Sequence, residues 1–152
     1  ASETFSAVSA PIQYAAIHAY NKDHSDYINA SRNILKSVGK YVYKNLSSNK
    51  VLISEPQGGF YLMPEFISSK FKSSSEMCKI ILNEIGVALL PGSDFGFDKK
   101  KLIARLSFTD FNGKNFMNEY QNNPNLTDDI IKKFAPKVVE GVDKLKKWSE
   151  TI

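Results

Sequence analysis

The sequence has few of the residues on which redox, metal and hydrolytic chemistry depend. It contains one cysteine and two histidines among 152 residues, so no internal disulfide can form. Cys78 has no second cysteine or histidine at metal-ligand spacing, and His18 and His24 complete no Ser-His-Asp or Cys-His arrangement. We therefore expect no metal site, and Cys78 fits a small residue on a buried or half-buried helix face.

Long hydrophobic runs are also missing. No run approaches the roughly 18 apolar residues that a membrane helix needs, and residues 1–4 lack the basic and apolar regions of a signal peptide. The composition, with 42% hydrophobic and 12% aromatic residues, is that of an ordinary globular protein. We expect a cytoplasmic protein with no membrane partner.

The positive charge is scattered rather than gathered. The formal net charge is +4, yet the only basic run is residues 99–101. This run precedes a predicted strand, where a solvated loop is a better interpretation than a phosphate or nucleic-acid contact. The aromatic and glycine signature of an RNA-binding sheet is absent, so we expect no nucleic-acid partner.

Arginine is scarce, with two arginines against eighteen lysines. Arg32 lies on a predicted helix face, whereas Arg105 lies inside the apolar run 102–108. A guanidinium group offers a planar fork of donors that matches carboxylate and phosphate groups in a bidentate geometry, which lysine cannot do. Arg105 is therefore the candidate for recognition of an anionic ligand.

Strand alternation separates Arg105 from its apolar neighbours. One face carries Leu102, Ala104, Leu106 and Phe108, and the other carries Ile103, Arg105, Ser107 and Thr109. A charge in such a strand needs a partner. That partner is either a ligand or an internal carboxylate such as Asp110 or Glu65, and the position alone does not decide between them.

Capping signals and periodicity predict the helices. The sequence predicts a helix entered at Ser9 and Pro11 and ending near Tyr20, and a longer one capped by Asp23 and ending near Leu46. The longer helix would span roughly 35 Å, a length typical of helices that brace two domains. Further helices are predicted at 73–85, where Ser73 and Glu76 form a capping box and Gly86 follows, at 113–120, and from Pro136 onward.

Strands are predicted at 51–54, 60–63, 87–90 and 102–109. We expect the first two to pair antiparallel across the turn at 57–59, with Pro64 ending regular pairing unless it lies at an edge. The fold class is α/β (α+β): a small, mixed, mainly antiparallel sheet covered by helices, with a long N-terminal connecting helix. The glycines at 58 and 59 suit either a tight turn or close approach to a ligand. The loop at 91–96 suits either a turn or a gate, and it is not a phosphate-binding loop.

Segments in a fixed order carry a family resemblance. They are residues 4–6 (TFS) with 9–13 (SAPIQ), 55–61 (EPQGGFY), 86–96 (GVALLPGSDFG) and 104–108 (ARLSF). Together, spread across most of residues 1–110, they resemble the C-terminal portion of class I/II aminotransferases, which are pyridoxal-phosphate enzymes of fold type I.

The resemblance implies a role for each segment. Arg105 matches the arginine that grips the α-carboxylate of the amino-acid substrate, and Gly59, Phe60 and Tyr61 match a turn near that substrate. Residues 23–152 would be the small domain and residues 1–22 a segment docked on the large domain or the dimer interface. The implied reaction is amino transfer between an L-amino acid and a 2-oxo acid, in a homodimer with pyridoxal 5'-phosphate as cofactor.

The resemblance also has a gap. The family's cofactor-binding lysine lies in a serine-and-lysine motif followed by glycine and arginine, and none of the eighteen lysines has that setting. We therefore expect no covalent cofactor, no confident cofactor ligand and no activity in this chain alone. Two other hypotheses stay open: a pyridoxal-phosphate lyase or synthase of the same fold, and a non-catalytic module in which Arg105 binds a carboxylate or phosphate.

Overall fold

The computed structural model describes residues 7–152. The motif at 4–6 and the start of the predicted docking segment 1–22 lie outside the described residues. The α-helices are α1 (Ala10–Tyr20), α2 (Ser25–Leu46), α3 (Ser74–Ile85), α4 (Gly113–Asn122), α5 (Asp128–Phe134) and α6 (Pro136–Ser149). The strands are β1 (Val51–Leu52), β2 (Tyr61–Leu62), β3 (Glu65–Phe66), β4 (Leu90–Pro91) and β5 (Ala104–Ser107), and a 3-10 helix, η1, covers Gly92–Phe95.

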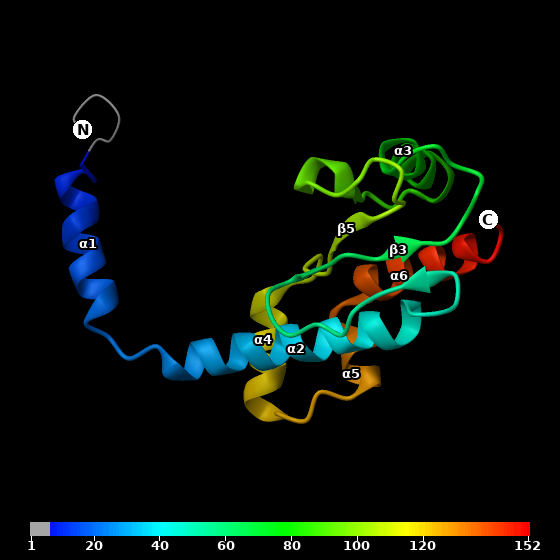
Figure 1. Ribbon diagram of the computed structural model, residues 1–152. Helices are drawn as coiled ribbons and strands as arrows, with labels where there is room; N and C mark the ends of the chain where they lie inside the picture. Colours follow the sequence, from blue (N-terminus) through cyan, green and yellow to red (C-terminus); the bar gives the residue numbers. More distant parts are fainter. Residues whose placement is uncertain (1–6) are drawn as a thin grey trace.

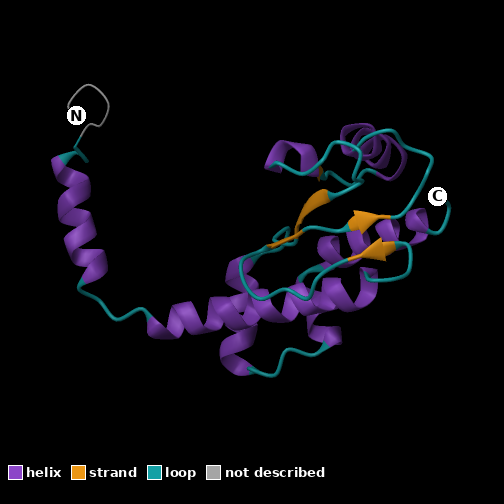
Figure 2. Cartoon of the chain, in the orientation of Figure 1, coloured by secondary structure: helices purple, strands orange, loops and turns teal. Residues whose placement is uncertain are grey.

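Helix α2 is the longest element and carries one side of the core. Its buried positions recur at helical spacing and include Ile34, Val38, Val42 and Leu46. It packs against α4, α5 and α6, and the short strands lie between α2 and α3 (Figures 1 and 2). Helix α1 has no buried residue and extends away from the rest of the chain (Figure 1).

Local hydrogen bonds and a glycine mark where the helices begin and end. The Ser73 half of the capping box of α3 is confirmed, since Ser73 Oγ accepts from Glu76 N at 3.2 Å, and Gly86 ends the helix in the left-handed region with φ 69°. The Glu76 carboxylate accepts from Lys72 N at 2.7 Å, one residue before the position that a capping box requires. Asp23 is not the cap predicted for α2. The helix begins one residue later, after His24, and the Asp23 carboxylate instead accepts from Ser25 N at 2.8 Å.

The predicted pairing of residues 51–54 with 60–63 is wrong. Strand β1 pairs antiparallel with β3, placing Val51 opposite Phe66, and both of these side chains are buried. Strand β2 pairs instead with β5, which is the centre of a three-stranded antiparallel sheet in the order β2-β5-β4. Pro64 lies between β2 and β3 at the edge of the sheet, where its carbonyl accepts from Ala104 N at 3.0 Å, so the predicted exception for an edge position applies.

The observed elements also differ from the predicted ones in their bounds and in one helix that was not predicted. The strands are shorter than predicted, the strand predicted at 87–90 is found at Leu90–Pro91, and α4 runs two residues past 120 to Asn122. Helix α5 was not predicted. Thr127 caps it by accepting from Ile130 N at 3.5 Å, and its seven residues are too few to show a clear apolar period.

Aromatic packing fixes the C-terminal helix on the sheet. The Trp148 ring stacks on Phe71 with centroids 5.6 Å apart and meets Phe66 edge-on at 5.9 Å. Its Nε1 donates to Glu84 Oε2 at 2.7 Å, so the polar edge of the buried indole is satisfied by α3. This hydrogen bond joins α3 to α6.

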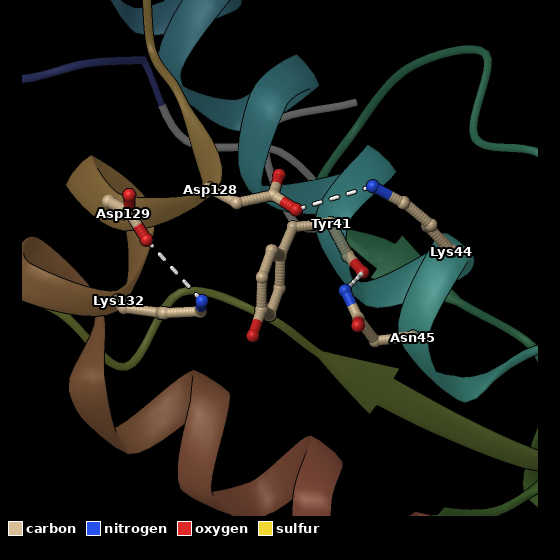
Figure 3. A network of polar contacts seen from close by, with 6 residues as sticks. All are labelled: Tyr41, Lys44, Asn45, Asp128, Asp129 and Lys132. Atoms are coloured by element: carbon tan, nitrogen blue, oxygen red, sulfur yellow. Dashed lines mark hydrogen bonds and ion pairs between the residues drawn. The ribbon is translucent and has the colours of Figure 1, made fainter.

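Polar contacts join α5 to α2 on the surface (Figure 3). Lys44 Nζ lies 3.3 Å from Asp128 Oδ2, and Lys132 Nζ lies 3.4 Å from Asp129 Oδ1. Beside them, burial raises the pKa of Tyr41, and the nearby Asp143 raises it further. Of these two pairs, Lys44–Asp128 joins α2 to α5, whereas Lys132–Asp129 lies within α5, and such exposed ion pairs contribute little energy each.

No helix in residues 7–152 is long and apolar enough to cross a membrane.

Candidate functional site

Strand β5 presents Arg105 on the open face of the sheet. Ala104 and Leu106 are buried toward the helices, Arg105 is half-buried and Ser107 is exposed, as the alternation predicted. Ile103 departs from that alternation, because it is 95% covered on the side assigned to Arg105. The cover comes from η1, whose Gly92 N donates to Ile103 O at 2.7 Å.

Two aromatic rings flank the guanidinium group. The Arg105 Cζ atom lies 4.4 Å from the ring centroid of Tyr61 and 4.2 Å from that of Phe95. Tyr61 stands opposite Ser107 in the β2–β5 pairing, so its side chain lies on the same face as Arg105 and diagonal to it. Phe95 arrives from η1, at the other side of the strand.

Neither internal carboxylate that the sequence left open forms an ion pair with Arg105. Asp110 Oδ1 lies 3.6 Å from Lys137 Nζ, and Glu65 takes part in none of the ion pairs within residues 7–152. None of the ion pairs within residues 7–152 includes Arg105. Within residues 7–152 its guanidinium therefore contacts ring faces and donates no side-chain hydrogen bond, which leaves its donors free for a ligand.

The turn before β2 brings the remaining predicted residues to the same edge. Gly59 adopts φ 70°, and nothing lies within 4 Å of the position of an added Cβ, so backbone conformation alone requires glycine there. Phe60 and Tyr61 are 39% and 41% exposed, with ring centroids 4.2 Å apart. The structure brings Tyr61 to Arg105, with Phe60 beside Tyr61.

Phe95 was not among the predicted site residues. The loop 91–96 was recognised only as a turn or gate, and an aromatic residue inside a turn gave no reason to place it over a strand nine residues away. The signal that the sequence offered was the glycine at position 92. Because glycine has no Cβ, η1 can pack directly onto β5: an added Cβ at Gly92 would lie 2.8 Å from Ile103 O.

Neither the Cys78 thiol nor the lysine amines are suited to act as nucleophiles. Burial raises the pKa of the Cys78 thiol to about 11, so the thiolate is not formed near neutral pH. None of the eighteen lysines is buried: seventeen are exposed, and half-buried Lys50 donates to Ile152 O at 3.0 Å. Within residues 7–152, no three His, Cys, Asp or Glu side chains are grouped to hold a metal ion.

Comparison with known proteins identifies the family. Residues 1–115 match the family described as aminotransferase class I and II. The chain belongs to this family. Its members are pyridoxal-phosphate-dependent transferases, so the family implies this cofactor for the full-length enzyme.

Individual aminotransferases match in sequence and in fold. The aspartate aminotransferase of Bacillus sp. (strain YM-2) is 37% identical over 89 residues, which cover 55% of this chain and 22% of that protein. The crystal structure of aspartate aminotransferase from Thermotoga maritima superposes with a TM-score of 0.63 at 25% identity, over 98% of this chain and 31% of that one. The aromatic aminotransferase of Pyrococcus horikoshii shares the fold, with a TM-score of 0.66 at 22% identity, over 92% and 31%.

The chain thus spans about a quarter of the length of the curated aminotransferases that it matches. Its residues do not fit the covalent attachment of pyridoxal phosphate. A lysine that forms such a bond is normally desolvated, or lies beside another cation, so that its amine is neutral. Seventeen lysines of this chain are exposed, and the half-buried Lys50 donates to Ile152 O, so none has such a setting. What the described residues do offer is a flanked, unpaired guanidinium on an open sheet face.

Proposed function

We propose that this chain is the small, C-terminal domain of an aminotransferase that moves an amino group between an L-amino acid and a 2-oxo acid. In this proposal Arg105 binds the α-carboxylate of the substrate, with Gly59, Phe60 and Tyr61 beside it. The observation that carries the proposal is the guanidinium of Arg105, which emerges on the open face of β5 without an ion pair in residues 7–152.

The chemistry of the group suits this role. A carboxylate can accept two parallel N–H bonds from one guanidinium, which fixes both its position and its plane. Holding the substrate in this way orients its reacting bonds before the chemical step, which lowers the entropic part of the barrier. Pyridoxal phosphate, held by a large domain outside this chain, would supply the electron-accepting chemistry.

The same proposal assigns a partner to the N-terminal segment. Helix α1 carries exposed apolar residues on several sides, among them Ile12, Tyr14 and Ile17, and its sequence has no acidic residue and no lysine or arginine. A helix that is apolar all round is normally covered. We propose that residues 1–22 dock on the large domain of the same protein or on the second subunit of a homodimer.

Replacing Arg105 with lysine in the complete protein tests the proposal. Lysine keeps the charge but loses the bidentate geometry, and a charged hydrogen bond contributes about 1.5–3 kcal/mol, so we expect kcat/KM to fall about 10- to 100-fold. KM should rise and kcat should fall, while the circular dichroism spectrum and melting temperature stay unchanged. Arg32→Lys, on the exposed face of α2, is the matched control. Unchanged kinetics in Arg105→Lys would exclude the assignment.

The reaction class is tested separately by supplying the two substrates one at a time. An aminotransferase forms a new amino acid continuously only when a 2-oxo acid is present as acceptor. Continuous turnover of the amino acid without an acceptor would instead identify a lyase or synthase of the same fold.

A further inference from the structure

The flanking rings of Arg105 are held in place by separate parts of the fold. Tyr61 is fixed by the β2–β5 pairing. Phe95 ends η1, which is tied to β5 by Gly92 and reaches the buried Ser74 of α3 through Ser93, whose Oγ lies 3.4 Å from Ser74 Oγ. Two rigid supports therefore bring two rings to one cation.

The rings approach the guanidinium from different directions. Each centroid lies within 4.4 Å of Arg105 Cζ, yet the rings of Tyr61 and Phe95 make no aromatic contact with each other among the described residues. A cation attracts an aromatic ring through the ring face, whereas the N–H donors of a guanidinium lie in its own plane. With ring faces on it, the group keeps its N–H edge for a ligand.

We propose that Phe95 is a positioning residue, which together with Tyr61 fixes the plane of the Arg105 guanidinium so that its N–H edge receives the substrate carboxylate. This inference rests on the proposed function and extends it to a residue that touches the arginine rather than the reacting atoms. A planar carboxylate can meet that edge with two in-plane bonds. Without Phe95 the guanidinium can rotate about the bonds of its side chain, so the plane of its two-donor edge is no longer fixed for the carboxylate.

Arginine resonances of the 152-residue chain test the placement directly. The chain has two arginines, so ¹⁵N-arginine labelling gives two Nε–Hε signals, with exposed Arg32 as internal reference. Ring currents from Tyr61 and Phe95 should displace the Arg105 signal upfield of that of Arg32. Phe95→Leu should move it back toward the reference, and Phe95→Tyr should restore the displacement. Phe97→Leu, on the same loop and 41% exposed, should leave it unmoved.

Kinetics of the complete, cofactor-loaded protein test the consequence. One cation–ring contact is lost in Phe95→Leu, so KM for the amino acid should rise about two- to fivefold while kcat changes less. Phe95→Tyr should recover the original KM, because it restores a ring face beside Arg105. Phe97→Leu should keep the original kinetics.

The two proposals fail in different ways. If Arg105→Lys impairs the enzyme while Phe95→Leu leaves both the Arg105 signal and KM unchanged, the positioning role of Phe95 is overturned and the carboxylate role of Arg105 stands. If Phe95→Leu shifts the signal but Phe95→Tyr does not restore KM, the ring acts through loop structure and the positioning role is likewise overturned. Unchanged kinetics in Arg105→Lys would remove the proposed function itself.

Discussion

A single missing methyl group at Gly92 decides where Phe95 can lie. An added Cβ there would lie 2.8 Å from Ile103 O and 2.9 Å from Ile103 Cβ, so η1 has to move off β5. We expect Gly92→Ala to lower the free energy of unfolding by about 1–3 kcal/mol. Thermal unfolding of the 152-residue chain measures the effect. Gly58→Ala is the control, since nothing lies within 4 Å of its added Cβ, and equal losses in the two variants would contradict the packing explanation.

The buried thiol of Cys78 makes stability depend on alkaline pH. Burial raises its pKa from 9.0 to about 11, so the folded state holds the proton more tightly than the unfolded chain does. The stabilisation is complete below about pH 9 and is lost as the pH rises toward 11. Urea unfolding across this range should show a shallower decline in Cys78→Ala than in the parent chain. Parallel curves would show that the thiol titrates normally.

At the scale of single residues, the sequence predicts Arg105 as part of the candidate site but does not predict Phe95. Arg105 stands out because arginine is rare in a lysine-rich chain and because it interrupts an apolar strand. Phe95 does not stand out, since its position depends on how closely a glycine lets one backbone approach another. Such contacts arise from tertiary packing and leave no local pattern.

Two helical glycines allow packing to be separated from helix propensity. An added Cβ at Gly141 in α6 meets nothing within 4 Å, so Gly141→Ala should stabilise the chain by about 0.5–1 kcal/mol, or a few degrees in melting temperature. In α2, an added Cβ at Gly39 would lie 3.1 Å from Phe108 Cζ. Gly39→Ala should therefore gain less than Gly141→Ala or lose stability. Calorimetry of both variants tests this, and equal gains would contradict the contact between α2 and Phe108.

Helices were predicted better than strands for a physical reason. The ends of α3 depend on Ser73, Glu76 and Gly86, which act within a few residues of one another. The partner of β2 depends on a strand more than forty residues away, and a two-residue strand has too few side chains to state its register. The pairing of β1 with β3 follows from burial of Val51 against Phe66, which the nearer apolar run at 60–63 concealed.

At the scale of the whole molecule, α1 is the exposed feature. Ile12 and Ile17 are each 57% exposed and Tyr20 is 89% exposed, so the 152-residue chain presents apolar surface that the proposed large domain or second subunit would cover. We expect concentration-dependent self-association in sedimentation velocity. The double substitution Ile12→Glu and Ile17→Glu should reduce this self-association, whereas Leu82→Glu, at an exposed position of α3, should not. A single monomer species at all concentrations would contradict the expectation.

The rings beside Arg105 also bear on whether its side chain loses rotamer entropy on folding or on ligand binding. An arginine side chain loses up to about 2 kcal/mol of rotamer entropy when it is immobilised. In the positioning role that we propose, Tyr61 and Phe95 hold Arg105 before a carboxylate arrives, so this loss occurs on folding instead of on binding. Carboxylate binding should accordingly carry a smaller entropic penalty than binding to a mobile surface arginine, at the expense of some stability in the free domain.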